Sequence, residues 1–157
     1  MQPELIDVLI VEDENELAQL HAELIDKHPR LRLAGIASTL ADARQKLNQL
    51  RPQLLLLDNY LPDGKGITLI SDPLVMNTNC SVIFITAASD MDTCSLAIRN
   101  GAFDYILKPI SWKRLSQSLE RFVLVCRTAA GMENCRSAKR RFTLPVTGEE
   151  LPSGEWQ

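Results

Sequence analysis

Short, continuous apolar runs alternate along this chain with segments in which apolar residues recur every three or four positions. Apolar runs at residues 8–11, 54–57, 82–85 and 105–107 predict strands, and a weaker strand is predicted at residues 31–37. The runs lack the alternation of apolar and polar residues that marks a half-exposed strand. They are therefore expected to be buried on both faces, as in a parallel sheet.

The segments between the strands have the spacing of amphipathic helices. The first, which Asn15 is expected to cap, carries Leu17, Leu20 and Leu24 on one face. In the third, Pro73 removes a backbone donor and is expected to kink or shorten the helix. The apolar faces of the second to fifth helices are formed by Leu40, Ala43, Leu47 and Leu50, by Ile67, Ile70 and Leu74, by Cys94, Ala97 and Ile98, and by Trp112, Leu115, Leu119, Phe122 and Cys126.

Five strand–helix units within residues 1–126 predict an α/β fold of the flavodoxin-like kind. In this fold a doubly wound parallel sheet has the strand order 2-1-3-4-5. Residues 127–157 are predicted to be the end of the last helix and a flexible tail, because apolar periodicity stops after Gly131. The tail buries too little apolar surface to offset its ordering entropy, so Trp156 is expected to be exposed.

Composition narrows the class of protein. The chain has 157 residues, of which 45% are hydrophobic and 24% charged, and its formal net charge is −3. These values are ordinary for a soluble domain and unlike those of a whole-chain nucleic-acid binder. No apolar run is long enough to cross a bilayer, so no membrane partner is expected. The four cysteines lack zinc-binding spacing, and we expect reduced packing thiols in a cytoplasmic protein.

Polar residues follow four of the predicted strands at the point where each strand ends. They are Glu12 and Asp13, then Asp58, then Thr86, and finally Lys108. The carboxyl ends of parallel strands share one edge of the sheet, where ligands bind. Two carboxylates ~4 Å apart repel by about 4 kcal/mol at an effective dielectric constant near 20. Three acids at this edge therefore favour a divalent cation, and Mg²⁺ is suitable because it takes oxygen ligands.

Each of these residues also has a plainer interpretation. Acidic residues after strands often cap helices, which is the interpretation we prefer for Glu14 and Glu16. It fails for Asp58, because the residues that follow have the composition of a turn. Together, the strand ends predict that Asp58 receives a phosphoryl group. The Thr86 hydroxyl is expected to donate a hydrogen bond to this group, and the Lys108 ammonium to pair with one of its oxygens as a point charge.

The same segments resemble a known family. The segments VEDEN at residues 11–15, LLDNYLPDG at 56–64, ITAA at 85–88 and GAFDYILKP at 101–109 are similar to motifs of the receiver domain of two-component response regulators. The resemblance extends over roughly residues 5–126. Within the family, the chain looks most like the citrate- and dicarboxylate-sensing transcription regulators.

The resemblance implies a domain that takes a phosphoryl group from a sensor histidine kinase, uses Mg²⁺, and catalyses only its own phosphorylation and dephosphorylation. It implies a cis peptide bond between Lys108 and Pro109. It also implies that the fourth helix, fifth strand and fifth helix form a surface for a homodimer or for another protein partner. The implied site residues are Asp58 as phospho-acceptor, Asp13 and Asp58 as Mg²⁺ ligands, Glu12 acting through water, Tyr60 through its backbone carbonyl, Thr86 and Lys108 as contacts of the phosphoryl group, and Tyr105 as an aromatic switch.

Three other classes of protein are alternatives to this interpretation. Regulators of this kind carry a C-terminal DNA-binding domain, whereas this chain ends at Gln157. DNA binding is therefore expected only through an absent output domain, and a stand-alone receiver that acts by protein contact is one alternative. A flavin- or dinucleotide-binding protein would need a glycine-rich loop where residues 12–15 stand. A haloacid-type phosphohydrolase would need a second Asp in place of Tyr60.

Overall fold

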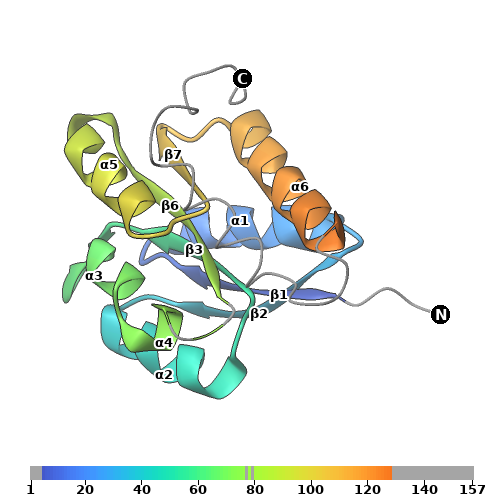
Figure 1. Cartoon of the computed structure of the whole chain (residues 1–157), viewed down its shortest axis with the longest axis horizontal. Coiled ribbons are helices and arrows are strands. Elements are labelled where there is room, and N and C mark those ends of the chain that lie inside the picture. The colour runs from blue at the N-terminus through green and yellow to red at the C-terminus, as the bar shows by residue number, and fades with distance from the viewer. Residues whose placement is uncertain (1–4, 77, 79, 129–157) are drawn as a thin grey trace.

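A five-stranded parallel sheet with helices on both faces forms the protein (Figure 1). The structure, a computed structural model, describes residues 5–76, 78 and 80–128. The strands of the sheet are β1 (Ile6–Val11), β2 (Leu31–Ala37), β3 (Leu54–Asp58), β6 (Ser81–Ala87) and β7 (Asp104–Lys108). The helices are α1 (Asn15–Lys27), α2 (Leu40–Leu50), α3 (Ile67–Ile70), α4 (Pro73–Met76), α5 (Met91–Arg99) and α6 (Trp112–Thr128), with a 3-10 turn, η1 (Ala88–Asp90), before α5.

The strand order is β2-β1-β3-β6-β7, and each neighbouring pair is parallel. These five strands are the first to fifth of the predicted sheet, so the order 2-1-3-4-5 and the flavodoxin-like fold class are confirmed. The turn predicted after Asp58 contains a small antiparallel hairpin of β4 (Tyr60–Leu61) and β5 (Gly64–Lys65). This hairpin stands apart from the main sheet and lies beside its carboxyl edge.

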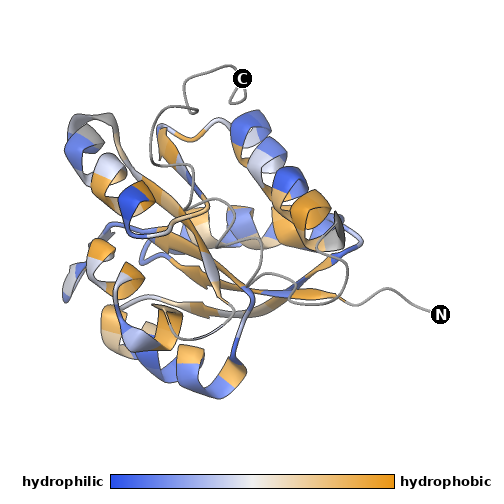
Figure 2. Cartoon of the chain, viewed as in Figure 1, coloured by the Kyte–Doolittle hydropathy of each residue, from blue (hydrophilic) through white to orange (hydrophobic). Residues whose placement is uncertain are grey.

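Two apolar layers cover the sheet, one on each face. The buried residues of α1 and α6 pack on one face, where Val8 and Ile10 of β1 point. Those of α2, α3, α4 and α5 pack on the other, where Leu9 and Val11 point. Figure 2 shows the strands as largely hydrophobic along their length. Because successive strand residues point to opposite faces, a sheet buried on both sides needs the continuous apolar runs seen in the sequence.

The predicted apolar face of α1 is wrong in part, because Leu24 packs against the core but is not among the fully buried residues of the helix. Its buried residues are Ala18, His21, Ala22 and Ile25, whereas Leu20 is 46% exposed. One position along a helix rotates a side chain by about 100°, so a small shift of the face exchanges core and solvent positions. Small alanine side chains let the helix lie close to the sheet, and the pattern of leucines does not reveal this. The helix begins at Asn15, and Glu14 takes the capping position without a side-chain bond.

The prediction that Pro73 interrupts the third helix is confirmed. The segment is split into α3 and α4, and Pro73 is the first residue of α4, where its missing N–H is not needed. Asp72 caps this short helix, because its carboxylate accepts a hydrogen bond from the Leu74 N–H at 2.9 Å. Arg44 of α2 pairs with the same side chain at 2.9 Å, which fixes α4 to α2.

Several predictions fall outside the part of the chain that the structure describes. They concern residues 129–157, including the flexible tail and the exposure of Trp156. Among the cysteines that are described, Cys80 and Cys94 are buried and Cys126 is half-buried, as expected of packing residues. None of the described helices combines the length and apolar character needed to cross a membrane.

Candidate functional site

Three carboxylates meet at the carboxyl edge of the sheet. Glu12 and Asp13 follow β1, and Asp58 is the last residue of the neighbouring strand β3. One oxygen from each side chain lies within 4.8 Å of the others. Glu12 and Asp58 are each 2% exposed, whereas Asp13 is open to solvent. The fold therefore brings together the three acids that the sequence places at the ends of adjacent strands.

Lys108 faces these acids from the end of β7. Its Nζ lies 2.8 Å from Asp58 Oδ1, and its side chain is 29% exposed. Burial would lower the pKa of Lys108, but the hydrogen bond and charge of Asp58 raise it, so the ammonium form is held at neutral pH. The peptide bond between Lys108 and Pro109 is cis, which confirms that expectation.

The acid cluster carries more negative charge than its protein neighbours balance. Burial, followed by the charge of Asp58, raises the pKa of Glu12 to about 7. Burial also raises the pKa of Asp58, although Lys108 opposes the effect. Glu12 Oε2 accepts a hydrogen bond from the Glu14 N–H at 3.1 Å, but its buried Oε1 has no partner within the described residues. Buried acidic groups with raised pKa values and an unpartnered oxygen are stabilised by binding a proton or a metal cation.

The donor set fits a hard divalent cation. All three side chains offer oxygen ligands, and the buried Oε1 of Glu12 has no hydrogen-bond partner among the described residues. Asp13 is exposed, so the cluster is open to water. Mg²⁺ binds through one or two carboxylates while keeping several waters, which suits this partly open cluster. The residues present therefore match the cofactor expected from the sequence.

Two residues that sequence reasoning missed shape the backbone after Asp58. The N–H of Asn59 donates to the Ile85 carbonyl of β6 at 3.1 Å, and its side-chain oxygen accepts from the Ile67 N–H at 3.1 Å. Gly66 donates its N–H to the Asn59 carbonyl at 2.8 Å. A Cβ at position 66 would lie 2.2 Å from the Asp58 carbonyl oxygen, so this close approach requires glycine. In the sequence, the signal for this close approach is Gly66 itself, which lies just beyond the predicted turn after Asp58.

Thr86 lies beside the acid cluster near the end of β6. It is buried, and its Oγ1 donates a hydrogen bond to Asp90 Oδ2 at 3.4 Å. The hydroxyl of Tyr60 also donates to Asp90 Oδ2. Lys65 Nζ lies 4.9 Å from the centre of the Tyr60 ring, in a cation–π contact. Asp90 is a further residue that the strand-end pattern did not reveal, because it lies one turn beyond the strand.

Tyr105 occupies β7 outside the acid cluster. The register pairs Phe84 with Tyr105 and Thr86 with Leu107, so Tyr105 and Thr86 point to the same face of the sheet. Tyr105 is half-buried and packs against the apolar layer that contains α5. It lies on the strand next to the one that bears Thr86, and its role as a switch stays a prediction.

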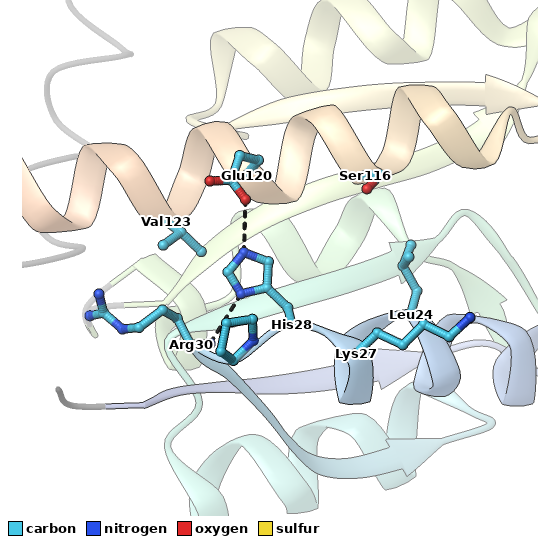
Figure 3. A pocket seen from close by; sticks show the side chains of 8 residues that line it. Leu24, Lys27, His28, Arg30, Ser116, Glu120 and Val123 are labelled. Atoms are coloured by element: carbon cyan, nitrogen blue, oxygen red, sulfur yellow. Dashed lines mark hydrogen bonds and ion pairs between the residues drawn. The ribbon is translucent and has the colours of Figure 1, made fainter. Parts of the chain in front are cut away.

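A separate cavity lies at the opposite, amino edge of the sheet, between α1, the start of β2 and α6 (Figure 3). Its volume is about 380 Å³. His28 Nε2 and Glu120 Oε1 are 2.8 Å apart across it, and His28 Nδ1 accepts from the Arg30 N–H at 3.0 Å. This arrangement ties the end of α1 to α6. None of the strand-end site residues lines this cavity.

Comparison with known proteins agrees with the geometry. The family model "Response regulator receiver domain" matches residues 8–120. Transcriptional regulatory protein DpiA of Escherichia coli (strain K12) is 49% identical over 154 residues, which cover 95% of this chain and 68% of DpiA. Transcriptional regulatory protein CitB of Klebsiella pneumoniae is 48% identical over 117 residues, 74% of this chain and 50% of CitB.

A solved structure extends the match to three dimensions. The receiver domain of NtrX from Brucella abortus superposes with a TM-score of 0.64 and 30% sequence identity, over 73% of this chain and 96% of that domain. The family model covers most of the chain, and the match to DpiA is strong over nearly all of it. The chain therefore belongs to the response regulator family, and its described part is a receiver domain.

Proposed function

We propose that Asp58 accepts a phosphoryl group from the phosphohistidine of a sensor histidine kinase. One observation carries the proposal: the buried Asp58 carboxylate has the Lys108 ammonium at 2.8 Å and two further acids within reach of a shared cation. A carboxylate nucleophile beside a fixed positive charge is the arrangement that phosphoryl transfer to Asp requires.

Mg²⁺ is the cofactor of the proposed reaction. Asp13 and Asp58 would hold it directly, Glu12 through water, and Tyr60 through its backbone carbonyl. When bound, the cation offsets the charge on the oxygens of the transferring phosphoryl group. Burial and then the charge of Asp58 raise the pKa of Glu12, and its buried Oε1 has no partner among the described residues; both support this assignment, because a nearby cation would stabilise the charged carboxylate.

The chain's own residues perform the remaining steps. Asp58 forms a bond from a carboxylate oxygen to phosphorus, while the bond from phosphorus to the donor imidazole breaks and the imidazole nitrogen keeps the electron pair. Lys108 stays close enough to pair with a phosphoryl oxygen as its contact with the Asp58 carboxylate loosens. Attack of water on phosphorus later returns Asp58 and inorganic phosphate. Positioning and charge stabilisation account for such a step.

The output of this reaction is a change at the face formed by α5, β7 and α6. The Thr86 hydroxyl turns to the new phosphoryl group, and Tyr105 moves inward on the same side of the sheet. We propose this face as the homodimer surface. Residues 1–126 would form the receiver domain, and transcription, which the names of DpiA and CitB indicate for those proteins, would be controlled through an output domain that binds DNA.

Replacing Asp58 tests the proposal. Asp58→Asn is nearly isosteric, so it should keep the fold but form no acid-labile phosphate with acetyl phosphate and Mg²⁺. Because burial raises the pKa of Asp58, the neutral amide should also increase the melting temperature without metal. Asp92→Asn, an exposed position in the first turn of α5, is the matched control and should be phosphorylated like the wild type. Undiminished phosphate on Asp58→Asn would refute the assignment.

A further inference from the structure

Asp90 is the acceptor for two hydroxyl groups at the mouth of the site. Its Oδ2 accepts from Thr86 Oγ1 at 3.4 Å and also from the hydroxyl of Tyr60. The two donors come from different segments, since Thr86 is near the end of β6 and Tyr60 is in the hairpin after Asp58. Asp90 itself ends η1 and immediately precedes α5. One carboxylate oxygen therefore joins the site to the first turn of α5.

The contact with Thr86 competes with the role proposed for that residue. A threonine hydroxyl has a single hydrogen to donate. While that hydrogen is directed to Asp90, it is not available to a phosphoryl group on Asp58. Giving up this bond has a free-energy cost, which the 3.4 Å length makes smaller than that of a short charge-assisted bond.

We propose that Asp90 is a positioning residue that stabilises the unphosphorylated state by holding the Thr86 hydroxyl away from Asp58. Tyr60 completes the arrangement, because its hydroxyl holds the Asp90 carboxylate in place. Phosphorylation then exchanges one anionic acceptor of Thr86 for another and frees Asp90, together with the first turn of α5. The inference rests on the proposed phosphorylation of Asp58.

The hydrogen-bond pattern gives each residue a distinct effect. Removing the Asp90 carboxylate should release Thr86 and favour the phosphorylated conformation. Removing the Tyr60 hydroxyl leaves the carboxylate charged but less well fixed, so the effect should have the same sign and be smaller. Neither change removes a ligand proposed for Mg²⁺, because the Tyr60 contribution is its backbone carbonyl.

The test measures binding of beryllium trifluoride anion, a stable mimic of the phosphoryl group on Asp, in the presence of Mg²⁺. Asp90→Ala should bind it about fivefold more tightly than the wild type, and Tyr60→Phe about twofold more tightly. Asp92→Ala is the matched control, because it removes a negative charge two residues further along, in the first turn of α5, and Asp92 is not the acceptor for either hydroxyl. It should change the affinity by less than twofold.

A double-mutant cycle separates the specific role from a structural one. If Asp90 acts through Thr86, the gain from Asp90→Ala should fall to that of Asp92→Ala when Thr86 is also replaced by Ala. A substitution that simply damages the site would weaken binding of the anion, whereas the proposal predicts tighter binding. Equal effects of Asp90→Ala and Asp92→Ala, weaker binding by Asp90→Ala, or a gain that survives Thr86→Ala would each overturn the inference. Failure of the wild type to bind the anion would instead refute the proposed function.

Discussion

Two buried titratable residues around the site have pKa values displaced in opposite directions. The pKa of Glu12 is raised to about 7, chiefly by burial. The pKa of His21 is lowered to about 4, first by burial and then by the charge of Lys108. Both His21 ring nitrogens lack a hydrogen-bond partner among the described residues, and the ring packs edge-on against Trp112 with centroids 5.6 Å apart. The contributions of Glu12 and His21 to the pH dependence of stability should therefore have opposite signs.

Replacing His21 should reveal its contribution to the pH dependence of stability. Its pKa falls from an ordinary value of 6.5 in the unfolded chain to about 4 in the fold, so the unfolded chain binds more protons between these values. Wild-type stability is lost as pH falls through this window. Relative to His21→Leu, the wild type should lose about 3 kcal/mol of unfolding free energy between pH 7 and 4. Urea unfolding without divalent cations measures this; parallel pH profiles would contradict it.

Replacing Glu12 should reveal the opposite contribution. Its pKa rises from an ordinary value of 4.5 to about 7, so the folded protein binds more protons between these values. Stability from this group increases as pH falls from 7 to 4.5. Relative to Glu12→Gln, the wild type should gain about 3 kcal/mol over that range without metal. Saturating Mg²⁺ should reduce the difference, and a profile of the other sign would disprove the account.

The close approach at Gly66 gives a third residue-level prediction. In Gly66→Ala the new Cβ would meet the Asp58 carbonyl oxygen at 2.2 Å, so the backbone that carries the acceptor must shift. We expect a loss of about 1–3 kcal/mol in stability and much slower phosphorylation by acetyl phosphate. Gly35→Ala is the control, because its nearest neighbour is the Leu50 side chain at 3.3 Å. Equal phosphorylation rates in the two variants would show that the contact is harmless.

At the scale of elements, the strands were predictable and the helix faces only in part. Each strand is a continuous apolar run because it is buried on both sides, and this signal is local. In α2 the predicted residues Leu40, Ala43 and Leu47 are buried, whereas Leu50, predicted for the same face, is 37% exposed. In α1 the buried face depends on the alanines that allow close contact with the sheet, a requirement set by the partner rather than by the helix.

The break between α3 and α4 supplies the prediction at this scale. Asp72→Ala removes both the cap of α4 and the ion pair with Arg44, and should cost about 1 kcal/mol of stability. Asp72→Asn keeps an oxygen for the Leu74 N–H but loses the charge, so it should cost less. Denaturant unfolding compares the variants, and phosphorylation should stay unchanged in both. Equal losses in the two variants would instead mean that the ion pair with Arg44 dominates and that the cap adds little.

For the whole molecule, the topology explains how much of the site could be predicted. A parallel sheet collects strand ends at one edge, so Asp13, Asp58 and Lys108 could be placed together from sequence alone. Asn59, Gly66 and Asp90 could not. Their roles depend on contacts between loops, and a loop's conformation carries no periodic signal in the sequence. The missed residues are those that hold the predicted ones in place.

The central claim is that Asp58 is the site of phosphorylation. The most direct test is to treat the wild-type protein with acetyl phosphate and Mg²⁺, reduce the acyl phosphate with borohydride, and locate the changed residue by peptide mass spectrometry. The account predicts modification at Asp58, lost when the metal is chelated. Modification at Asp13 or Glu12 instead, or a product that forms equally well with the metal removed, would contradict it.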